Sequence, residues 1–305
     1  MTETDAWPSL PFAAWRDTCA TLHMWTQVIG KFRLAQAPSI NHWWQVPLYL
    51  TSRGLTTSPM PYGTRTFQID FDFIAHRLSI QTSNGRADGF PLQPLTVADF
   101  YREVGGRLRA LGLDIRVWTM PVEVADPVRF EDDRAHRAYD ADYANRFWRV
   151  LVQADRVLTA FRGGFIGKAS PVHFFWGSFD LAVTRFSGRR APLHPGAPNM
   201  SDRITREAYS HEVSSCGFWP GGAGFDRPIF YSYAYPQPPG FAEAAVRPPA
   251  ASYNRELGEF ILPYQSVCEA AAPDAMLREF LQSTYEAAAD LAQWDRAALE
   301  RGGLA

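Results

Sequence analysis

Hydrophobic positions along the chain recur with two different periods. Apolar residues are spaced three or four apart over residues 15–29 and again over residues 148–161, which is the spacing of a half-buried helix. Over residues 66–73, apolar side chains alternate with polar ones, which is the period of a strand with one buried face. The same criteria predict further helices at residues 97–111 and 274–294, and further strands at residues 46–52, 78–82, 178–184, 211–219 and 229–235.

The predicted elements occur twice in the same order. Each series opens with a helix that begins Trp-Arg, at residues 15–16 and 148–149, and an Ile-Gly-Lys sequence follows each helix. Strands joined by short turns come next, and a helix closes each series. This order predicts an α+β fold built from two pseudo-symmetric helix–antiparallel-sheet–helix halves, rather than a doubly wound parallel sheet.

The two halves are expected at residues 1–118 and 148–305, within one compact unit. The segment between them, residues 119–147, is rich in proline and acidic residues and is predicted to be a linker. Residues 187–208 carry Gly, Pro and Arg and are predicted to be a mobile insertion. Because ligand sites are common where two such units meet, we expect a pocket in the groove between the halves.

Charge and cysteine content narrow the classes of partner. The 305 residues carry a formal net charge of −2 and no run of basic residues, so we expect no nucleic-acid partner. No apolar run approaches the roughly 18 residues that cross a bilayer, and the first residues lack the apolar core of a signal peptide, so we expect no membrane association. Three widely separated cysteines, Cys19, Cys216 and Cys268, favour a reducing compartment and a cytoplasmic location.

Two features of the composition indicate candidate chemistry. Aromatic residues make up 14% of the chain and include ten tryptophans, enough large flat side chains to line a pocket as well as a core. Only two of the 30 basic residues are lysines, and both, Lys31 and Lys168, follow Ile-Gly after the first helix of a half. Arginine cannot lose its proton or form an imine, so a functional role for these lysines is one hypothesis. Stabilisation of the helix C-terminus is the alternative.

Arg53 and Arg185 form a second basic pair, because they follow Trp44 and Trp176, respectively, by nine positions. We expect them at equivalent strand ends, where two arginines can bind a carboxylate or phosphate. Arginines that extend over the surface are the alternative. The two tryptophans are predicted to line the pocket, together with Trp219.

Three histidines are candidates for acid–base catalysis. His42 and His173 lie within aromatic clusters, and His211 opens a predicted strand. Counting along the chain predicts that His173 and Arg185 share one face of the strands. Histidines that only pack against the aromatic rings are the alternative.

The tyrosines at 231, 233 and 235 alternate along one predicted strand, so they form either a wall on which a planar ligand stacks or part of the core. No metal-binding spacing of His or Cys occurs, and the chain has no glycine-rich phosphate loop and no nucleophile elbow. We therefore expect no metal and no cofactor.

Several stretches of the chain resemble a widespread bacterial family that is catalogued only as a domain of unknown function. The similar stretches are residues 22–27, 41–44, 170–190, 209–219 and 279–294, and residues 173–188 are the most specific of them. The resemblance extends over nearly the whole chain and implies that the two halves belong to one unit. It brings no activity.

The leading hypothesis is a cytosolic enzyme whose aromatic-lined pocket between the halves binds a small anionic metabolite. Its reaction type is open between lyase, isomerase and hydrolase. The candidate catalytic residues are Lys168, His173 and His211, and the candidate substrate-binding residues are Arg185, Arg53, His42, Trp44, Trp176, Trp219 and Lys31. The alternatives are a non-catalytic ligand-binding or sensory protein that uses the same pocket, and an interaction protein with an apolar face on residues 279–294.

Overall fold

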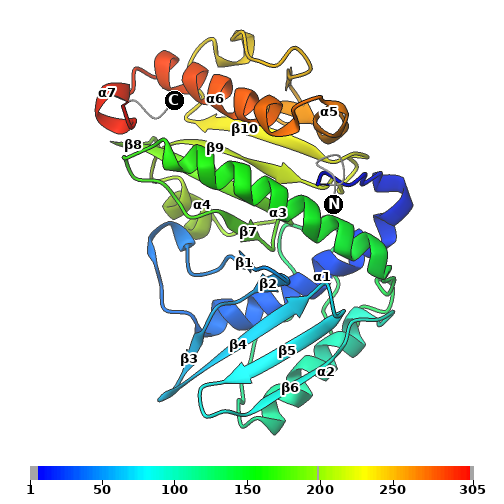
Figure 1. The fold of residues 1–305 in the computed structure, drawn as a ribbon. Helices are drawn as coiled ribbons and strands as arrows, with labels where there is room; N and C mark the ends of the chain where they lie inside the picture. Colours follow the sequence, from blue (N-terminus) through cyan, green and yellow to red (C-terminus); the bar gives the residue numbers. More distant parts are fainter. Residues whose placement is uncertain (1–5, 198, 303–305) are drawn as a thin grey trace.

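The computed structural model describes residues 6–197 and 199–302. Within these residues the chain forms two antiparallel sheets of six strands each, with helices packed against them (Figure 1), which confirms the α+β class. None of the described helices is long and apolar enough to cross a membrane. The predictions about the absence of a signal peptide and about the outer ends of the two halves involve residues 1–5 and 303–305, which lie outside the described residues.

The first sheet is formed by residues 49–91. Helix α1 (Phe12–Gln36) and the 3₁₀ turn η2 (Asn41–Trp43) precede it, and helix α2 (Val97–Ala110) follows it. Its strands are β1 (Tyr49–Leu50), β2 (Gly54–Thr56), β3 (Met60–Tyr62), β4 (Arg65–Asp72), β5 (Arg77–Thr82) and β6 (Ala87–Pro91). The alternating residues of β4 bury one face as predicted, and the side chain of Thr96 caps α2 by accepting a hydrogen bond from the N–H of Asp99.

The second sheet is formed by residues 173–263. Helix α3 (Ala141–Gly163) precedes it, and helices α5 (Tyr264–Glu269), α6 (Pro273–Leu291) and α7 (Arg296–Leu299) follow it. Its strands are β7 (His173–Phe175), β8 (Asp180–Arg190), β9 (His211–Trp219), β10 (Ile229–Tyr235), β11 (Ser252–Asn254) and β12 (Glu259–Pro263). Helix α4 (Asp202–Ala208) lies between β8 and β9, and the 3₁₀ turn η3 (Phe241–Glu243) lies between β10 and β11.

The two sheets have similar strand orders. The first runs β1-β2-β4-β5-β6, with β3 beside β4, and the second runs β7-β8-β9-β10-β12-β11. This similarity agrees with two related halves, but their origin by duplication stays a prediction. The predicted equivalence of Arg53 and Arg185 in the two halves is wrong. Arg53 lies in the turn between β1 and β2, whereas Arg185 lies in the middle of β8. The constant spacing from a tryptophan to an arginine is therefore not a structural equivalence.

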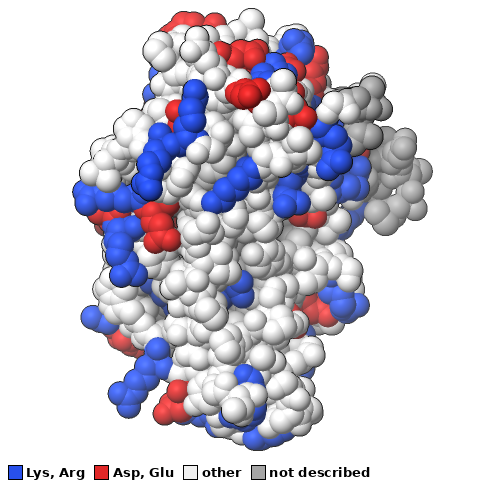
Figure 2. Space-filling view, turned by 90° about the vertical axis from the view of Figure 1, so that its left-hand side faces the viewer, with Lys and Arg blue, Asp and Glu red and all other residues white. Residues whose placement is uncertain are grey.

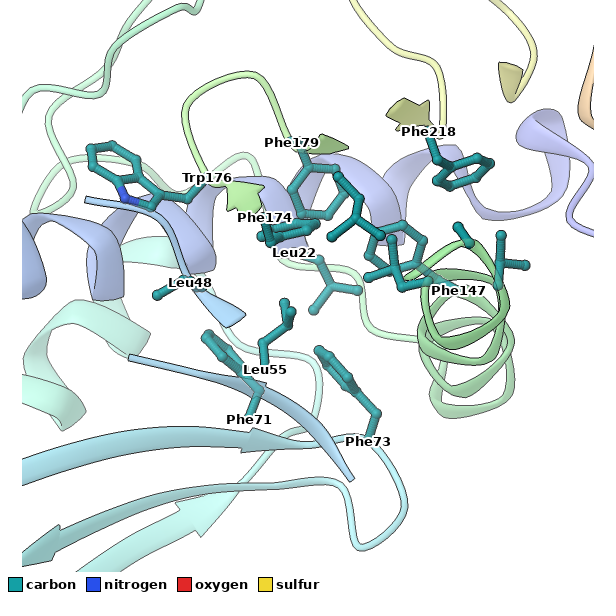
Figure 3. Packing of buried hydrophobic residues seen from close by; sticks show 14 of the residues in the cluster. Leu22, Leu48, Leu55, Phe71, Phe73, Phe147, Phe174, Trp176, Phe179 and Phe218 are labelled. Atoms are coloured by element: carbon teal, nitrogen blue, oxygen red, sulfur yellow. The ribbon is translucent and has the colours of Figure 1, made fainter. Parts of the chain in front are cut away.

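The sheets meet through their first strands. The backbone N–H of Leu48 donates to the carbonyl of Phe174 at 2.9 Å, and the N–H of Phe174 donates to the carbonyl of Leu48 at 3.0 Å. Buried side chains around this contact form one continuous core that includes residues of both sheets and of α1 and α3 (Figure 3). The two halves therefore share a core instead of folding as separate domains.

Helix α1 is buried along most of its length, and not on one face only as the spacing of its apolar residues predicted. At its C-terminal end the indole of Trp176 lies against Gly30, and a Cβ atom at this position would overlap the indole ring. The Trp176 Nε1–H donates to the carbonyl of Val46 at 2.7 Å. One tryptophan thus joins the turn after β7 to α1 and to the segment that enters the first sheet.

The structure corrects three boundaries. Helix α1 ends at Gln36, so the Ile-Gly-Lys sequence at residues 29–31 lies inside the helix and not after it. Helix α3 begins at Ala141, inside the predicted linker, because Asp140 caps the helix by accepting a hydrogen bond from the N–H of Tyr143. The predicted insertion at residues 187–208 contains the end of β8 and helix α4, so much of it is regular structure.

The expected common face of His173 and Arg185 is also wrong. Residues 176–179 form a turn between β7 and β8, and counting along the chain does not carry the alternation through a turn. His173 is paired with Ala182 and therefore shares its face, whereas Arg185 is an odd number of positions away and points to the opposite face.

Gly30→Ala should destabilise the protein, because the added methyl group has no space beside Trp176. We expect the free energy of unfolding in urea to fall by about 1–3 kcal/mol. Gly106→Ala is the matched control, because Gly106 is also helical and a Cβ there meets nothing within 4 Å. That change should stabilise the protein by about 0.5–1 kcal/mol. Equal effects of the two substitutions would contradict the proposed packing.

Candidate functional site

A cleft of about 1130 Å³ lies between residues of the first half and one face of the second sheet. The end of α1 and the segment at residues 42–46 form one side, and β8, β9, β10 and α4 form the other. Residues 118–127, which all belong to the predicted linker except Trp118, close a third side. Figure 2 shows that charged side chains of both signs occur on the face it displays.

Lys31 lies at the α1 end of the cleft. The residue is only 3% exposed, and its Nζ lies 4.9 Å from the ring centroid of Trp118 and 5.8 Å from that of Trp176. No hydrogen bond or ion pair joins this amine to any residue that the structure describes. Burial lowers the pKa of Lys31 to about 8. Two aromatic faces partly compensate the charge, but no anionic side chain among the described residues does.

Lys168 is an exposed residue and is not part of the cleft wall. Its Nζ lies 2.6 Å from Nε2 of His42, and His42 does line the cleft. Because Nδ1 of His42 lies 3.1 Å from the carbonyl of Ala208, Nδ1 carries the proton and Nε2 accepts from the Lys168 ammonium. Burial lowers the pKa of both side chains, and the positive charge of Lys168 lowers that of His42 further.

The other two candidate histidines do not line the cleft. His173 is fully buried among the rings of Trp44, Tyr49 and Phe175, and neither ring nitrogen has a hydrogen-bond partner among the described residues. Burial lowers the pKa of His173 to about 3, so the ring is neutral and packs like an aromatic side chain. His211 lies beside His42, with 5.8 Å between the ring centroids.

Neither arginine of the predicted pair lines the cleft. Arg185 lies on the opposite face of the sheet, between the rings of Phe161 and Tyr285, and its guanidinium donates to the carbonyl of Phe161. Arg53 is half exposed and forms an ion pair with Asp72 at 2.6 Å. Both arginines therefore have structural contacts.

Two of the three candidate tryptophans line the cleft, and the third lies elsewhere. Trp44 and Trp176 are on its wall, as predicted. Trp219 lines an adjoining cavity of about 760 Å³, where it stacks on Phe225 with 5.5 Å between ring centroids.

A group of buried and partly buried acids and tyrosines, for which the sequence predicts no site, also lines the cleft. Asp180 is 8% exposed and accepts hydrogen bonds from the hydroxyls of Tyr231 and Ser178. The hydroxyls of Tyr209 and Tyr233 lie 2.8 Å apart beside them. Burial raises the pKa of Asp180.

Glu123 belongs to the same group and has an unusual backbone. Its φ of 58° lies in the left-handed region, which a non-glycine residue adopts at some cost in free energy. Its carboxyl group approaches Gly177 so closely that a Cβ there would overlap it, and it accepts no hydrogen bond from the described residues. Burial, with a smaller contribution from the negative charge of Asp180, raises the pKa of Glu123 to about 7.

Only part of this group has a signal in the sequence. Asp180 interrupts the apolar run from Phe179 to Val183, and a carboxylate in such a run is a candidate buried acid. The alternation of Tyr231 and Tyr233 was noted, and both do line the cleft. Glu123 lies in a proline-rich segment without periodicity, so nothing in the sequence distinguishes it. Among the described residues, no group of three or more His, Cys, Asp or Glu side chains is arranged to hold a metal ion.

The model of a family of unknown function, DUF5996, matches residues 7–301 of the chain. The chain belongs to DUF5996. This membership confirms the resemblance seen in the sequence and covers both halves and the cleft. No curated protein and no solved structure shows significant similarity to the chain. The chemistry of this DUF5996 member therefore has to be argued from the cleft itself.

Lys31→Met should stabilise the protein at neutral pH. The pKa of Lys31 in the folded protein, about 8, lies below its ordinary value of 10.5, so the folded state disfavours the ammonium form. The free-energy cost of burying the ammonium is fully present below about pH 8. It disappears as the pH rises past the ordinary lysine pKa of 10.5. We expect the variant to gain about 1–3 kcal/mol in free energy of unfolding at pH 6.5 and to lose this advantage above pH 10.

The control for this prediction is Lys168→Met, because Lys168 is exposed and its amine contacts a histidine. It should not stabilise the protein. If Lys31→Met lowered the stability at pH 6.5, the amine would have a favourable partner, and the description of an uncompensated buried charge would be wrong.

Proposed function

We propose that this protein is a cytoplasmic enzyme that binds a small anionic metabolite in the inter-sheet cleft and transforms it by general acid–base catalysis. The observation that carries the proposal is that Lys31 and Glu123 line one cleft with opposite charges and form no ion pair with each other. Burying such groups without partners is unfavourable, and proteins retain them mainly at functional sites.

Lys31 suits the role of anion-binding group. Its amine faces the cleft beside Trp118, which is 65% exposed, and Trp176, which is buried. A carboxylate or phosphate that entered between the two indoles would supply the missing counter-charge, and the indoles would contact the apolar part of the metabolite. This is the substrate-binding role that the sequence predicts for Lys31.

Glu123 suits the role of proton-transfer group. General acid–base catalysis is most effective when the pKa of the catalytic group is near the working pH, and the pKa of Glu123 is about 7. Asp180 and the hydroxyl of Tyr231 lie beside it and can stabilise either protonation state through their hydrogen bond. Proton transfer is a step common to the lyase, isomerase and hydrolase classes, so the proposal is limited to that step.

Ligand binding without catalysis is the second candidate function. The observation that favours it is the exposed indole of Trp118 over Lys31, an arrangement that serves recognition alone equally well. An experiment that measures both ligand binding and ligand conversion distinguishes the two functions.

Pools of anionic metabolites should be screened by thermal shift, and the hits followed by mass spectrometry for conversion. We expect a ligand that raises the melting temperature of the native protein and is consumed. Lys31→Met should weaken its binding by about tenfold or more, because it removes the counter-charge. Glu123→Gln should retain binding but reduce turnover by about 100-fold or more.

The control variant for this experiment is Glu256→Gln, which removes an exposed carboxylate outside the cleft and should leave both properties unchanged. Binding without conversion by the native protein would establish the ligand-binding function. Equal binding by native protein and Lys31→Met would overturn both candidate functions of the cleft.

The pH dependence of turnover should be bell-shaped. Activity should rise as Glu123 loses its proton near pH 7 and fall as Lys31 loses its charge near pH 8. Lys31→Arg should remove the alkaline limb, because guanidinium stays charged in this range. An unchanged alkaline limb in Lys31→Arg would assign that limb to another group.

A further inference from the structure

The adjoining cavity shares a wall with the cleft. Six residues line both spaces: Glu123, Ser178, Asp180, Tyr209, Tyr231 and Tyr233. On its outer side the cavity is bounded by the first turns of α1 and by the glycine-rich loop between β9 and β10. Its lining differs in charge from that of the cleft, because Lys31 belongs to the cleft alone.

We infer that this adjoining cavity is a binding site for an organic cation, an alkylammonium group that the carboxyl groups of Asp180, Glu123 and Glu259 and the surrounding aromatic rings enclose. The inference goes beyond the proposed function, since it concerns a second ligand group and does not require catalysis in the cleft.

The charge of the lining is the first support for this inference. Asp180, Glu123 and Glu259 all line the cavity, and none of the three forms an ion pair with a lysine or arginine among the described residues. Arg16, the basic residue of the lining, has a side chain that is 70% exposed and lies 3.7 Å from Asp17. A buried carboxyl group without a counter-cation is unfavourable, and a bound ammonium group would supply that charge.

The aromatic rings are the second, independent support. Tyr231 and Tyr233 stack with 6.2 Å between centroids and 15° between planes, and Trp219, on the neighbouring strand β9, stacks on Phe225. The faces of such rings attract cations, and cages of aromatic rings with carboxylates are the usual sites for substituted ammonium groups. The hydroxyls of Tyr231 and Tyr233 are already hydrogen-bonded to Asp180 and Tyr209, so the rings are held in place.

Protonation links this site to pH. Burial, and next the negative charge of Asp180, raise the pKa of Glu259 to about 8, and that of Glu123 is about 7. A cation binds best when these groups are ionised, so its binding should release protons and become tighter as the pH rises. The other titratable or charged groups that face the cavity are Arg16, Cys19 and His23 of α1, Asp226 of the β9–β10 loop, and the tyrosines. His23 has a pKa of about 4 and stays neutral in this range.

Choline is a suitable probe, because its charge does not depend on pH and 3,3-dimethylbutan-1-ol is a neutral molecule of the same shape. We expect calorimetry at pH 8.5 to show choline binding about tenfold or more tighter than the alcohol. Choline should bind about tenfold more weakly at pH 6.0, where Glu123 and Glu259 hold their protons.

Variants locate the site. Asp180→Asn and Glu259→Gln should each weaken choline binding by about fivefold or more, whereas Glu256→Gln should not change it. Lys31→Met should also leave it unchanged, which separates this site from the anion site of the cleft. The carboxyl group of Glu259 forms no hydrogen bond or ion pair with the described residues, so its variant keeps the test valid if Asp180→Asn folds poorly. Equal binding of choline and the alcohol, or binding that neither carboxyl variant weakens, would overturn the inference.

Discussion

The contact between Trp176 and Gly30 is the constraint on which the rest of the site depends. It is possible only because Gly30 has no side chain, and the hydrogen bond from Trp176 to the carbonyl of Val46 fixes the indole in position. Residue 31, directly after this glycine, is the lysine of the cleft. The turn at residues 176–179, which begins with this tryptophan, places Gly177 against Glu123 and leads directly to Asp180, the first residue of β8. One packing contact therefore places the basic and the acidic ends of the cleft relative to each other.

The cleft exists because the faces of the second sheet have different neighbours. One face is covered by α3 and α6, and here even a charged side chain, Arg185, is enclosed by aromatic rings. The other face carries Thr184, Ser215 and the tyrosines of β10, and it is only partly covered by segments from the first half. A sheet face with this mixture of small polar and aromatic residues is suited to binding a ligand rather than to packing another layer.

Lys31 and Glu123 show how the cleft departs from ordinary packing. Both are held away from water, the first between indole rings and the second on a strained left-handed backbone. Each departure lowers the stability of the folded protein, and the two occur together on the wall of one cavity. Structural ion pairs elsewhere in the chain, such as Arg53 with Asp72, have partners at hydrogen-bonding distance. This contrast between charged groups with and without partners is the physical reason for proposing that the cleft is the functional site.

Local patterns in the sequence determined the class of the fold and most of its elements. The alternation at β4 and the helical spacing at α2, α3 and α6 depend on burying one face of each element, and this requirement is visible in any single segment. Only the tertiary structure decided which of the repeated residues share a site. Lys31 and Lys168 have the same local sequence, but Trp176 and Trp118 enclose only Lys31. Arg185 and His173 lie on opposite faces because the turn between β7 and β8 interrupts the alternation of side chains along the strands. Glu123 lies in a segment without regular secondary structure. Contacts between residues far apart in the chain set burial, and burial sets the pKa of these groups, so no local pattern could reveal them.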